Sequence, residues 1–462
     1  MFKKIFYRPQ TGVCADFIPF YDEGEFKLYF LRDYRDFDKH GEGTPWQLTV
    51  TKDLISFTDE VEVISRGTKE EQDLYVFTGC VNKIDGKYHI FYTGHNPHLR
   101  RQGKPEQAVM HAVSKDGVNF TKIPADTFFA PGDKYEMHDW RDPFIFFDKD
   151  KGHYVMLLAA RTKEGPAIRK GCTAVCVSKD LKKWKVTGNI LEPRAFFTHE
   201  CPDYFEIGEW KYIIYSEFSD RCITRYKMSK DGVTWLTPKV DNFDGRAYYA
   251  AKSACNGKNR YLFGWIPTKK DSDHAHWDWG GDLAIHEIIQ GKDGTLYTKM
   301  PRSIKESFTK TYLDVKEIVL GTATTDEVKT IINREIDEYY LECEIEFDEN
   351  LTGVGLLLNF DEVADRGYGY TLNLFNNLFA FDVYPNQPWN LTNFINVHRP
   401  LELKRKYKLQ LLVEKNIAVA YLDDKYALST RMYPLATPTF NLGLIAKNGV
   451  AKFKNLKIKT RK

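Results

Sequence analysis

Alternating apolar and polar residues behind tight turns recur along the first two thirds of the chain. Five segments join a glycine-containing turn to an aromatic, alternating strand: EGEFKLYFL (23–31), DGKYHIFYTG (85–94), KGHYVMLLAA (151–160), IGEWKYIIYSE (207–217) and GKNRYLFGWI (257–266). A second box accompanies four of them, and its aspartate is expected to cap backbone N–H groups of a turn: TKDLISF (51–57), SKDGVNF (114–120), SKDLKKW (178–184) and SKDGVTW (229–235). Both patterns return after roughly 50 to 65 residues, as a supersecondary unit repeated around an axis would.

This repeat predicts the architecture of the first domain. Short strands and turns at such a spacing are typical of propeller blades with four strands each. Five hairpin turns therefore predict a five-bladed β-propeller over residues 1–302, which the strand HAHWDWGGDLAIHEI (274–288) would close. No stretch keeps the apolar period of a helix, so we expect few helices.

The pattern changes after LYTKMPR (296–302). Residues 303–335 are polar and irregular, and they predict a linker. Regular alternating strands with Asn, Asp and Gly turns then predict a β-sandwich over residues 336–462: YYLECEIEF (339–347), GVGLLLNF (353–360), GYTLNLFNNLFAFDVY (369–384), YKLQLLVEKNIAVAYLDD (407–424) and TFNLGLIAKNGVAKFKNLKI (439–458). The predicted fold class is all-β, and the second domain, which has no clustered acid, His or Cys set, is expected to be structural or ancillary.

Acidic residues recur ahead of the hairpin turns. Eight to ten residues upstream of the turn glycine stand Asp16 in CADF, Phe77-Thr78-Gly79 in VFTGC, Asp142 in WRDPF, Glu200 in HECPDYF and Tyr248-Tyr249 in AYYAAK. We expect these positions to be equivalent, near the start of the first strand of each blade. Because the innermost strands of a propeller line its channel, the three carboxylates are expected to converge at one end of it.

Converging carboxylates are the residues that glycosidic bond cleavage needs. Hydrolysis with retention uses two carboxyl groups about 5–5.5 Å apart, one as the nucleophile and one as the acid that later becomes the base. The acid must begin protonated, so its pKa is raised by burial or by a neighbouring negative charge. A third carboxylate can bind sugar hydroxyls and stabilise the transition state.

The ordered set of Asp16, Arg141-Asp142-Pro143 and Glu200-Cys201-Pro202-Asp203 resembles glycoside hydrolase family 32. Members of that family are β-fructosidases with a five-bladed propeller followed by a β-sandwich. The resemblance covers essentially the whole chain, with further matches at PW-x4-TKDL (45–54), FTGC (77–80), FYTG (91–94), YYAAKSA (248–254), FGW (263–265) and WGGDL (279–283).

The resemblance implies roles for individual residues. Asp16 would be the nucleophile, Glu200 the general acid/base and Asp142 the transition-state stabiliser. The fructose site would be completed by four side chains and by an arginine that orients the carboxylates or contacts the sugar: Trp46, Phe77, Thr78, Trp279 and Arg141. The implied activity is a retaining β-fructofuranosidase that releases terminal fructose from short fructosides or fructo-oligosaccharides through a covalent fructosyl-enzyme intermediate.

The surroundings of Asp16 depart from the family pattern. The usual motif is Trp-Met-Asn-Asp-Pro-Asn-Gly, whereas this chain has Gly-Val-Cys-Ala-Asp-Phe-Ile at 12–18. Leu31 stands where the family has a Gln at the end of the first strand. Since these positions line the sugar site and its approach, the chain is expected to be a divergent member that acts on an unusual fructoside.

Other interpretations remain open from the residues alone. A fructosyltransferase would use the same carboxylates, and a non-catalytic carbohydrate-binding propeller would need none of them as catalysts. A related five-bladed fold that releases pentoses by inversion would hold its carboxyl groups about 6.5–9.5 Å apart. Structurally, Asp16 and Asp142 could be turn residues, Glu200 could pair with an arginine, and Trp277 and Trp279 could be either core or sugar platform.

The composition and charge of the chain limit the classes of partner that we expect it to bind. The chain has 462 residues, 42% apolar and 28% charged, and a net charge of +2 without a basic face, so we expect neither nucleic acid nor membrane as a partner. The expected partner is a small carbohydrate, and the sequence leaves the oligomeric state open. The N-terminus lacks the pattern of a secretion signal, so a cytoplasmic location is predicted.

Neither a metal nor a cofactor is expected. The eight cysteines form no Cys-x-x-Cys pair, so reduced thiols are the simplest interpretation. His274, His276 and Asp278 have a weak metal-ligand spacing, and histidines at the rim of a substrate site explain them better. Carboxylates alone suffice for the chemistry above.

Overall fold

Strands dominate the computed structural model, which describes residues 2–219, 221–270, 272, 275–333, 336–385, 397–433 and 441–461. In these residues the α-helices are three short ones, α1 (Phe37–His40), α2 (Pro97–Arg100) and α3 (Arg302–Glu306). None of the described helices is long and apolar enough to cross a membrane. The predictions of an all-β chain and of few helices are confirmed.

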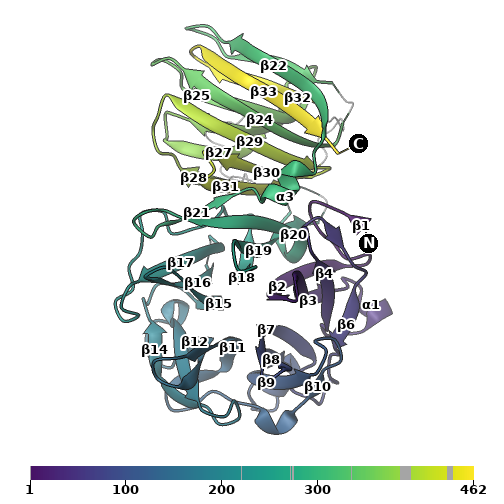
Figure 1. The fold of residues 1–462 in the computed structure, drawn as a ribbon, viewed down its shortest axis with the longest axis vertical. Helices are drawn as coiled ribbons and strands as arrows, with labels where there is room; N and C mark the ends of the chain where they lie inside the picture. Colours follow the sequence, from purple (N-terminus) through teal and green to yellow (C-terminus); the bar gives the residue numbers. More distant parts are fainter. Residues whose placement is uncertain are drawn as a thin grey trace.

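The N-terminal sheets stand around a common centre (Figure 1). Three of them are separate antiparallel units: β7 (Tyr75–Ile84), β8 (Lys87–His95), β9 (Gln107–Ser114) and β10 (Thr121–Lys122); β11 (Tyr135–Asp148), β12 (His153–Thr162), β13 (Gly171–Ser178) and β14 (Lys185–Leu191); and β15 (Thr198–Ile207), β16 (Trp210–Phe218) and β17 (Ile223–Ser229). In Figure 1 the strands that begin each unit, β7, β11 and β15, lie nearest the centre.

A ten-stranded sheet closes the ring. It contains β1 (Phe2–Lys3), β2 (Val13–Asp22), β3 (Glu25–Asp33), β4 (Trp46–Thr51), β5 (Ser56–Phe57), β6 (Val61–Ile64), β18 (Tyr249–Cys255), β19 (Arg260–Lys269), β20 (Trp277–Gln290) and β21 (Leu296–Lys299). The early and late strands of this sheet meet where β2 pairs with β20, at Cys14 and Gly281. The strand expected to close the ring at 274–288 therefore corresponds to β20, which begins at Trp277.

Local turn chemistry explains why the repeats fold alike. Asp85 and Gly86 both have positive φ, 48° and 75°, as a two-residue hairpin turn between β7 and β8 requires. In the box that begins at Ser114, the Asp116 carboxylate accepts the N–H groups of Val118 at 2.9 Å and Asn119 at 2.8 Å. The prediction that these aspartates cap turns is confirmed.

Two six-stranded sheets form the C-terminal part. One has the order β22 (Lys310–Leu320), β33 (Ala451–Thr460), β24 (Glu338–Phe347), β29 (Lys406–Glu414), β30 (Ile417–Leu422), β31 (Tyr426–Arg431). The other has the order β23 (Glu327–Ile332), β32 (Leu442–Lys447), β25 (Gly353–Asp361), β26 (Arg366–Asn373), β27 (Leu378–Tyr384), β28 (Val397–Pro400). One hydrophobic core joins them, with Leu341 and Ile345 from the first sheet and Leu356 and Tyr370 from the second.

The expected linker at 303–335 contains two of these strands. β22 pairs with β33, and β23 pairs with β32, so this stretch is not irregular throughout. Both strands stand at sheet edges, and most residues of β22 are exposed. An exposed edge strand buries little apolar surface, which is why its sequence looks like a polar loop.

Buried polar contacts tie the C-terminal sheets to the ring. His286 of β20 lies between the Asp244 carboxylate, at 2.9 Å, and the Tyr421 hydroxyl of β30, at 2.8 Å. Asp244 also accepts the N–H of Ser429 at 2.8 Å and its hydroxyl at 2.6 Å. Asp244, His286 and Ser429 are fully or almost fully buried, so water does not substitute for these bonds.

Candidate active site

The central strands share one irregularity. The five central strands are β2, β7, β11, β15 and β18. In each of them the register with the paired strand shifts at an equivalent position. We call the residue at this slip the bulge position, and it is occupied by Asp16, Thr78, Asp142, Cys201 and Ala250. A bulge turns a side chain away from the direction that regular pleating would give it.

Backbone strain marks the same positions. Asp16, Asp142, Cys201 and Ala250 have φ of 38°, 58°, 51° and 51°. A residue other than glycine in this region costs on the order of 1 kcal/mol or more, and such strain persists where the surroundings impose it. Four strands from different parts of the chain thus adopt the same costly conformation around the centre of the ring.

Glu200 does not occupy the same position as Asp16 and Asp142. It precedes the bulge, as Arg141 and Tyr249 do in β11 and β18. The predicted equivalence of the three carboxylates is therefore wrong by one residue for Glu200. The offset has a consequence, because the three residues at this preceding position bond to one another: Glu200 accepts from Arg141 Nη2 at 2.9 Å and from the Tyr249 hydroxyl at 2.7 Å.

Asp16 is buried and firmly held. Its side chain accepts the Thr78 hydroxyl on Oδ2 at 2.5 Å and the Trp265 indole N–H on Oδ1 at 2.8 Å. Burial raises the pKa of Asp16 to about 7, and the negative charges of Asp142 and Glu200 add to this, while the two hydrogen bonds oppose it. The group therefore changes its charge near neutral pH.

Asp142 occupies the bulge position of β11, and its charge acts on Asp16. Its backbone N–H donates to the Thr93 hydroxyl at 2.7 Å, and its Oδ2 accepts the N–H of Cys201 at 2.9 Å. Burial raises the pKa of Asp142, against the attraction of Arg141. The Cys201 thiol lies 4.0 Å from Asp16 Oδ2, so Cys201, which follows Glu200 directly on β15, contacts both aspartates.

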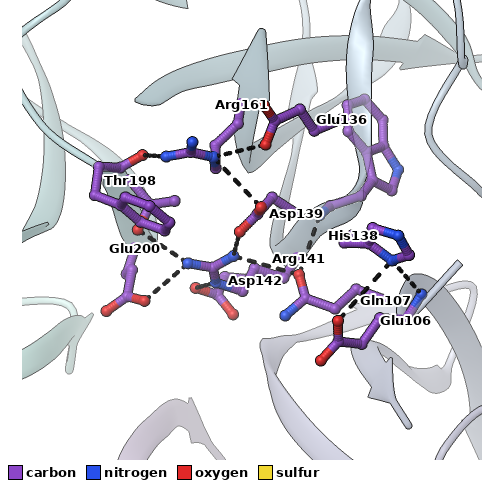
Figure 2. Close-up of polar contacts among 12 residues, drawn as sticks. Glu106, Gln107, Glu136, His138, Asp139, Arg141, Asp142, Arg161, Thr198 and Glu200 are labelled. Carbon is purple, nitrogen blue, oxygen red and sulfur yellow. Dashed lines mark hydrogen bonds and ion pairs between the residues drawn. The ribbon is translucent and has the colours of Figure 1, made fainter. Parts of the chain in front are cut away.

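Arg141 links Glu200 to other residues of β11 and β15 (Figure 2). Its Nη2 donates to Glu200 and to the Thr198 hydroxyl, both at 2.9 Å, and its Nη1 donates to Asp139 at 2.8 Å. Its Nε lies 3.9 Å from Asp142 Oδ2. One guanidinium thus contacts two of the three candidate carboxylates.

The other predicted sugar-site residues divide into two kinds. Phe77 packs on the His95 ring at 4.8 Å and lies 5.9 Å from the Trp279 ring, and Trp279 is 36% exposed. Thr78 bonds to Asp16, as described. Trp46, by contrast, is fully buried and donates its indole N–H to the Phe77 carbonyl at 3.1 Å, so it supports Phe77 from behind.

Sequence reasoning missed several residues of the site. Trp265 and Tyr249 lie in the FGW and YYAAKSA motifs, which were noted without a role for either side chain. No pattern in the sequence pointed to Asp139 or Thr93 as residues of the site; they only lie in or next to short motifs. Trp277, left open between core and platform, is half-buried, with the Lys269 ammonium 4.3 Å from its ring centroid.

The described residues contain neither a candidate metal-binding group nor a disulfide. No group of three His, Cys, Asp or Glu side chains among them could hold a metal ion. His274 lies outside the described residues. All eight cysteines are described, and none is in a disulfide.

Comparison with known proteins identifies the family. A model of the glycosyl hydrolases family 32 N-terminal domain matches residues 7–300, more than half of the chain. The chain belongs to glycoside hydrolase family 32. This family 32 protein is therefore a glycosidase of the fructofuranosidase type.

Individual relatives are distant but extensive. The family 32 chain is 24% identical to the levanbiose-producing levanase of Bacillus subtilis (strain 168), over 96% of this chain and 87% of that protein. It is 22% identical to the sucrose-6-phosphate hydrolase of Vibrio alginolyticus, over 84% and 77%. The structure of fructan 1-exohydrolase IIa from Cichorium intybus matches with a TM-score of 0.77 at 15% identity, over 98% and 96%.

Proposed function

We propose that this family 32 glycosidase is a retaining β-fructofuranosidase that removes terminal fructose units through a fructosyl-enzyme intermediate. The observation that carries the proposal is the presence of two unlike carboxyl groups on the central strands β2 and β15, near enough for the charge of Glu200 to raise the pKa of Asp16. Asp16 is buried and bonded to Thr78 and Trp265, whereas the Glu200 side chain is 19% exposed and bonded to Arg141 and Tyr249. Different surroundings suit two carboxyl groups to two different roles.

In this mechanism Asp16 attacks the anomeric carbon of the fructosyl unit. Thr78 and Trp265 hold its carboxylate, so the nucleophile reaches the substrate already oriented. Glu200 donates its proton to the leaving oxygen and then takes a proton from the water that cleaves the intermediate. Two displacements on the same carbon return the original configuration.

Asp142 and Arg141 assist without forming bonds to the sugar carbon. The Cys201 N–H fixes one oxygen of Asp142, and the carboxylate would accept fructose hydroxyls and favour the positive charge of the transition state. Arg141 would orient Glu200. Phe77 and Trp279 would line the fructose site directly, while Thr78 would act through its bond to Asp16 and Trp46 through its bond to Phe77.

The architecture fits this assignment. We propose that the ring at 1–302 is a five-bladed propeller in which the ten-stranded sheet supplies the first and last blades. The two C-terminal sheets would form a β-sandwich, and this domain would begin at β22, because β22 and β23 belong to its sheets. The shared core of the two sheets supports that boundary.

The named relatives suggest a substrate class. One is described as a levanase that produces levanbiose, another as a sucrose-6-phosphate hydrolase. We therefore propose a small fructoside or fructan end as the substrate. A fructosyltransferase would use the same residues and would differ only in the acceptor, and a binding propeller would turn over nothing.

The test is a substrate panel with purified protein, Glu200→Gln and Glu206→Gln. The control residue Glu206 lies on the same strand and is exposed. Sucrose, its 6-phosphate, kestose, inulin-type and levan-type oligosaccharides, and aryl arabinoside and xyloside are incubated and the sugars separated by chromatography. We expect fructose release by the wild type and Glu206→Gln, and at least a 100-fold loss in Glu200→Gln, which lacks the general acid.

The products separate the alternatives. Methyl β-fructofuranoside, formed when methanol replaces water, would support retention, and the α-anomer would contradict it. Longer oligosaccharides at high substrate concentration would indicate a transferase, and released levanbiose would indicate cleavage two units from the end. Full activity of Glu200→Gln, or activity on the pentosides alone, would refute the assignment.

A further inference from the structure

Asp139 lies between two guanidinium groups at the edge of the site (Figure 2). It precedes Arg141 by two residues on β11, so their side chains point to the same face of the strand. Asp139 Oδ1 accepts from Arg141 Nη1 at 2.8 Å, and Oδ2 lies 3.4 Å from Arg161 Nε. An ordered row of alternating charge therefore runs from Arg161 through Asp139 and Arg141 to Glu200.

Arg161 forms the fixed end of this row. Its side chain is 4% exposed and donates to the carbonyls of Phe197 at 2.8 Å and Ala167 at 2.5 Å. Its guanidinium lies 3.7 Å from the Phe197 ring centroid, and Nε also donates to Glu136 at 2.9 Å. Arg161 is thus held on several sides and gives Asp139 a fixed charged partner.

Arg141 has little freedom of its own. A guanidinium is planar with its donors in a fixed fork, so fixing one nitrogen orients the others. Asp139 and Gln107 hold Nη1, at 2.8 and 3.3 Å, while Nη2 reaches Thr198 and Glu200. The bond to Glu200 is therefore set by groups that never touch the substrate.

The negative charge of Asp139 matters because Arg141, which Asp139 contacts, also contacts Glu200. A cation 2.9 Å from a carboxyl group favours its ionised form, whereas a general acid must hold its proton. A second carboxylate on the same guanidinium offsets that effect. The charged and titratable groups around Arg141, Asp139, Asp142 and Glu200 come from several strands: Glu136 of β11, Arg161 of β12, His95 of β8, Glu106 before β9, Asp16 of β2, and Tyr249 and Lys252 of β18.

We propose that Asp139, anchored by Arg161, is a positioning residue that orients Arg141 and offsets its charge, so that Glu200 can keep the proton it donates. The inference rests on the proposed role of Glu200 as acid/base. It extends that role to a residue outside the three-carboxylate set and predicts an effect on the proton, not on sugar binding.

The test compares the pH profiles of kcat/KM for wild type, Asp139→Asn and Asp139→Glu. Asparagine keeps an acceptor for Arg141 but removes the charge, so Arg141 acts more strongly on Glu200. We expect the basic limb of the profile to move to lower pH by about one unit. At the wild-type optimum kcat should fall about tenfold while KM stays within about twofold, and Asp139→Glu should restore most of kcat.

The control is Asp148→Asn, at the far end of the same strand, where the carboxylate accepts the N–H groups of Asp150 and Lys151. It removes the same charge, and its pH profile should match the wild type. Arg161→Lys keeps a cation near Asp139 without the fork, so it should lower kcat without moving the limb as far. Melting temperatures establish that each variant is folded.

The outcomes are distinct from those of the proposed function. If Glu200→Gln remains active, the acid/base assignment falls and this inference with it. If Glu200 is essential but folded Asp139→Asn keeps the wild-type limb, or raises KM with kcat unchanged, the positioning role is refuted alone. A basic limb that moves to higher pH would refute the charge argument.

Discussion

Replacing Asp16 by Asn should stabilise the protein while abolishing its activity. The carboxylate is buried among Asp142 and Glu200, and its pKa is raised to about 7 from an ordinary value of 3.8. Asparagine has nearly the same shape. Its oxygen can accept from Trp265, and its amide can donate to the oxygen of the Thr78 hydroxyl, so a hydrogen bond can form at both of the positions where Asp16 has one.

The raised pKa gives the size of the effect. Each pKa unit is worth about 1.36 kcal/mol, so the rise from 3.8 to about 7 corresponds to at most about 4 kcal/mol against the ionised folded state. Below about pH 4 the carboxyl is protonated in both states, and the variant gains nothing. The wild type loses stability as pH rises from about 4 to 7, so the advantage of Asp16→Asn should grow over that window and then stay constant.

The assay is the melting temperature of wild type and variant from pH 4 to pH 8.5. The control is Asp231→Asn, whose carboxylate is exposed and has its pKa lowered by the backbone N–H groups of Thr234 and Val233. A lowered pKa stabilises the folded state above the ordinary pKa, so this variant should melt lower, not higher, near neutral pH. If Asp16→Asn melts at or below the wild type at pH 8, or its advantage does not grow with pH, the reasoning is refuted.

Two further predictions concern hydrogen bonds that the fold brings together. Trp265→Phe removes a donor 2.8 Å from Asp16 and thereby disfavours the ionised form of Asp16. The acidic limb of the kcat/KM pH profile should therefore move to higher pH by about 1–2 units. An acidic limb that stays in place would contradict this prediction. Asp244→Ala leaves His286 and Ser429 without the carboxylate to which both are bonded in the interior. The free energy of unfolding, measured by denaturant titration, should therefore fall by about 3–5 kcal/mol. A loss under about 1 kcal/mol would contradict the importance of this network.

Several features were predictable from the sequence because their causes are local. A two-residue turn needs positive φ, and Asp85-Gly86 supplies it; a strand with one buried face alternates, and the repeats do. The short motifs around Asp142 and Glu200 were readable for the same reason. Alternation between Tyr339 and Ile458 likewise predicted most of the C-terminal strands.

Other features exist only once strands pair. A bulge is a property of two strands in register, so no single segment reveals that Glu200 stands one residue before the positions of Asp16 and Asp142. An edge strand such as β22 keeps a polar sequence because one side has no neighbour. Trp46 was expected at the sugar, yet its ring is fully buried behind Phe77.

Sequence alone determined the period of the repeat, the turns, the alternation and the candidate carboxylates, because each depends on residues close together in the chain. Tertiary structure decided which groups meet: Trp265 reaches Asp16 across 249 positions, and Arg141 reaches Glu200 across 59. The charge and orientation of the proposed catalytic groups depend on those distant partners, since burial and hydrogen bonding arise only when the ring closes.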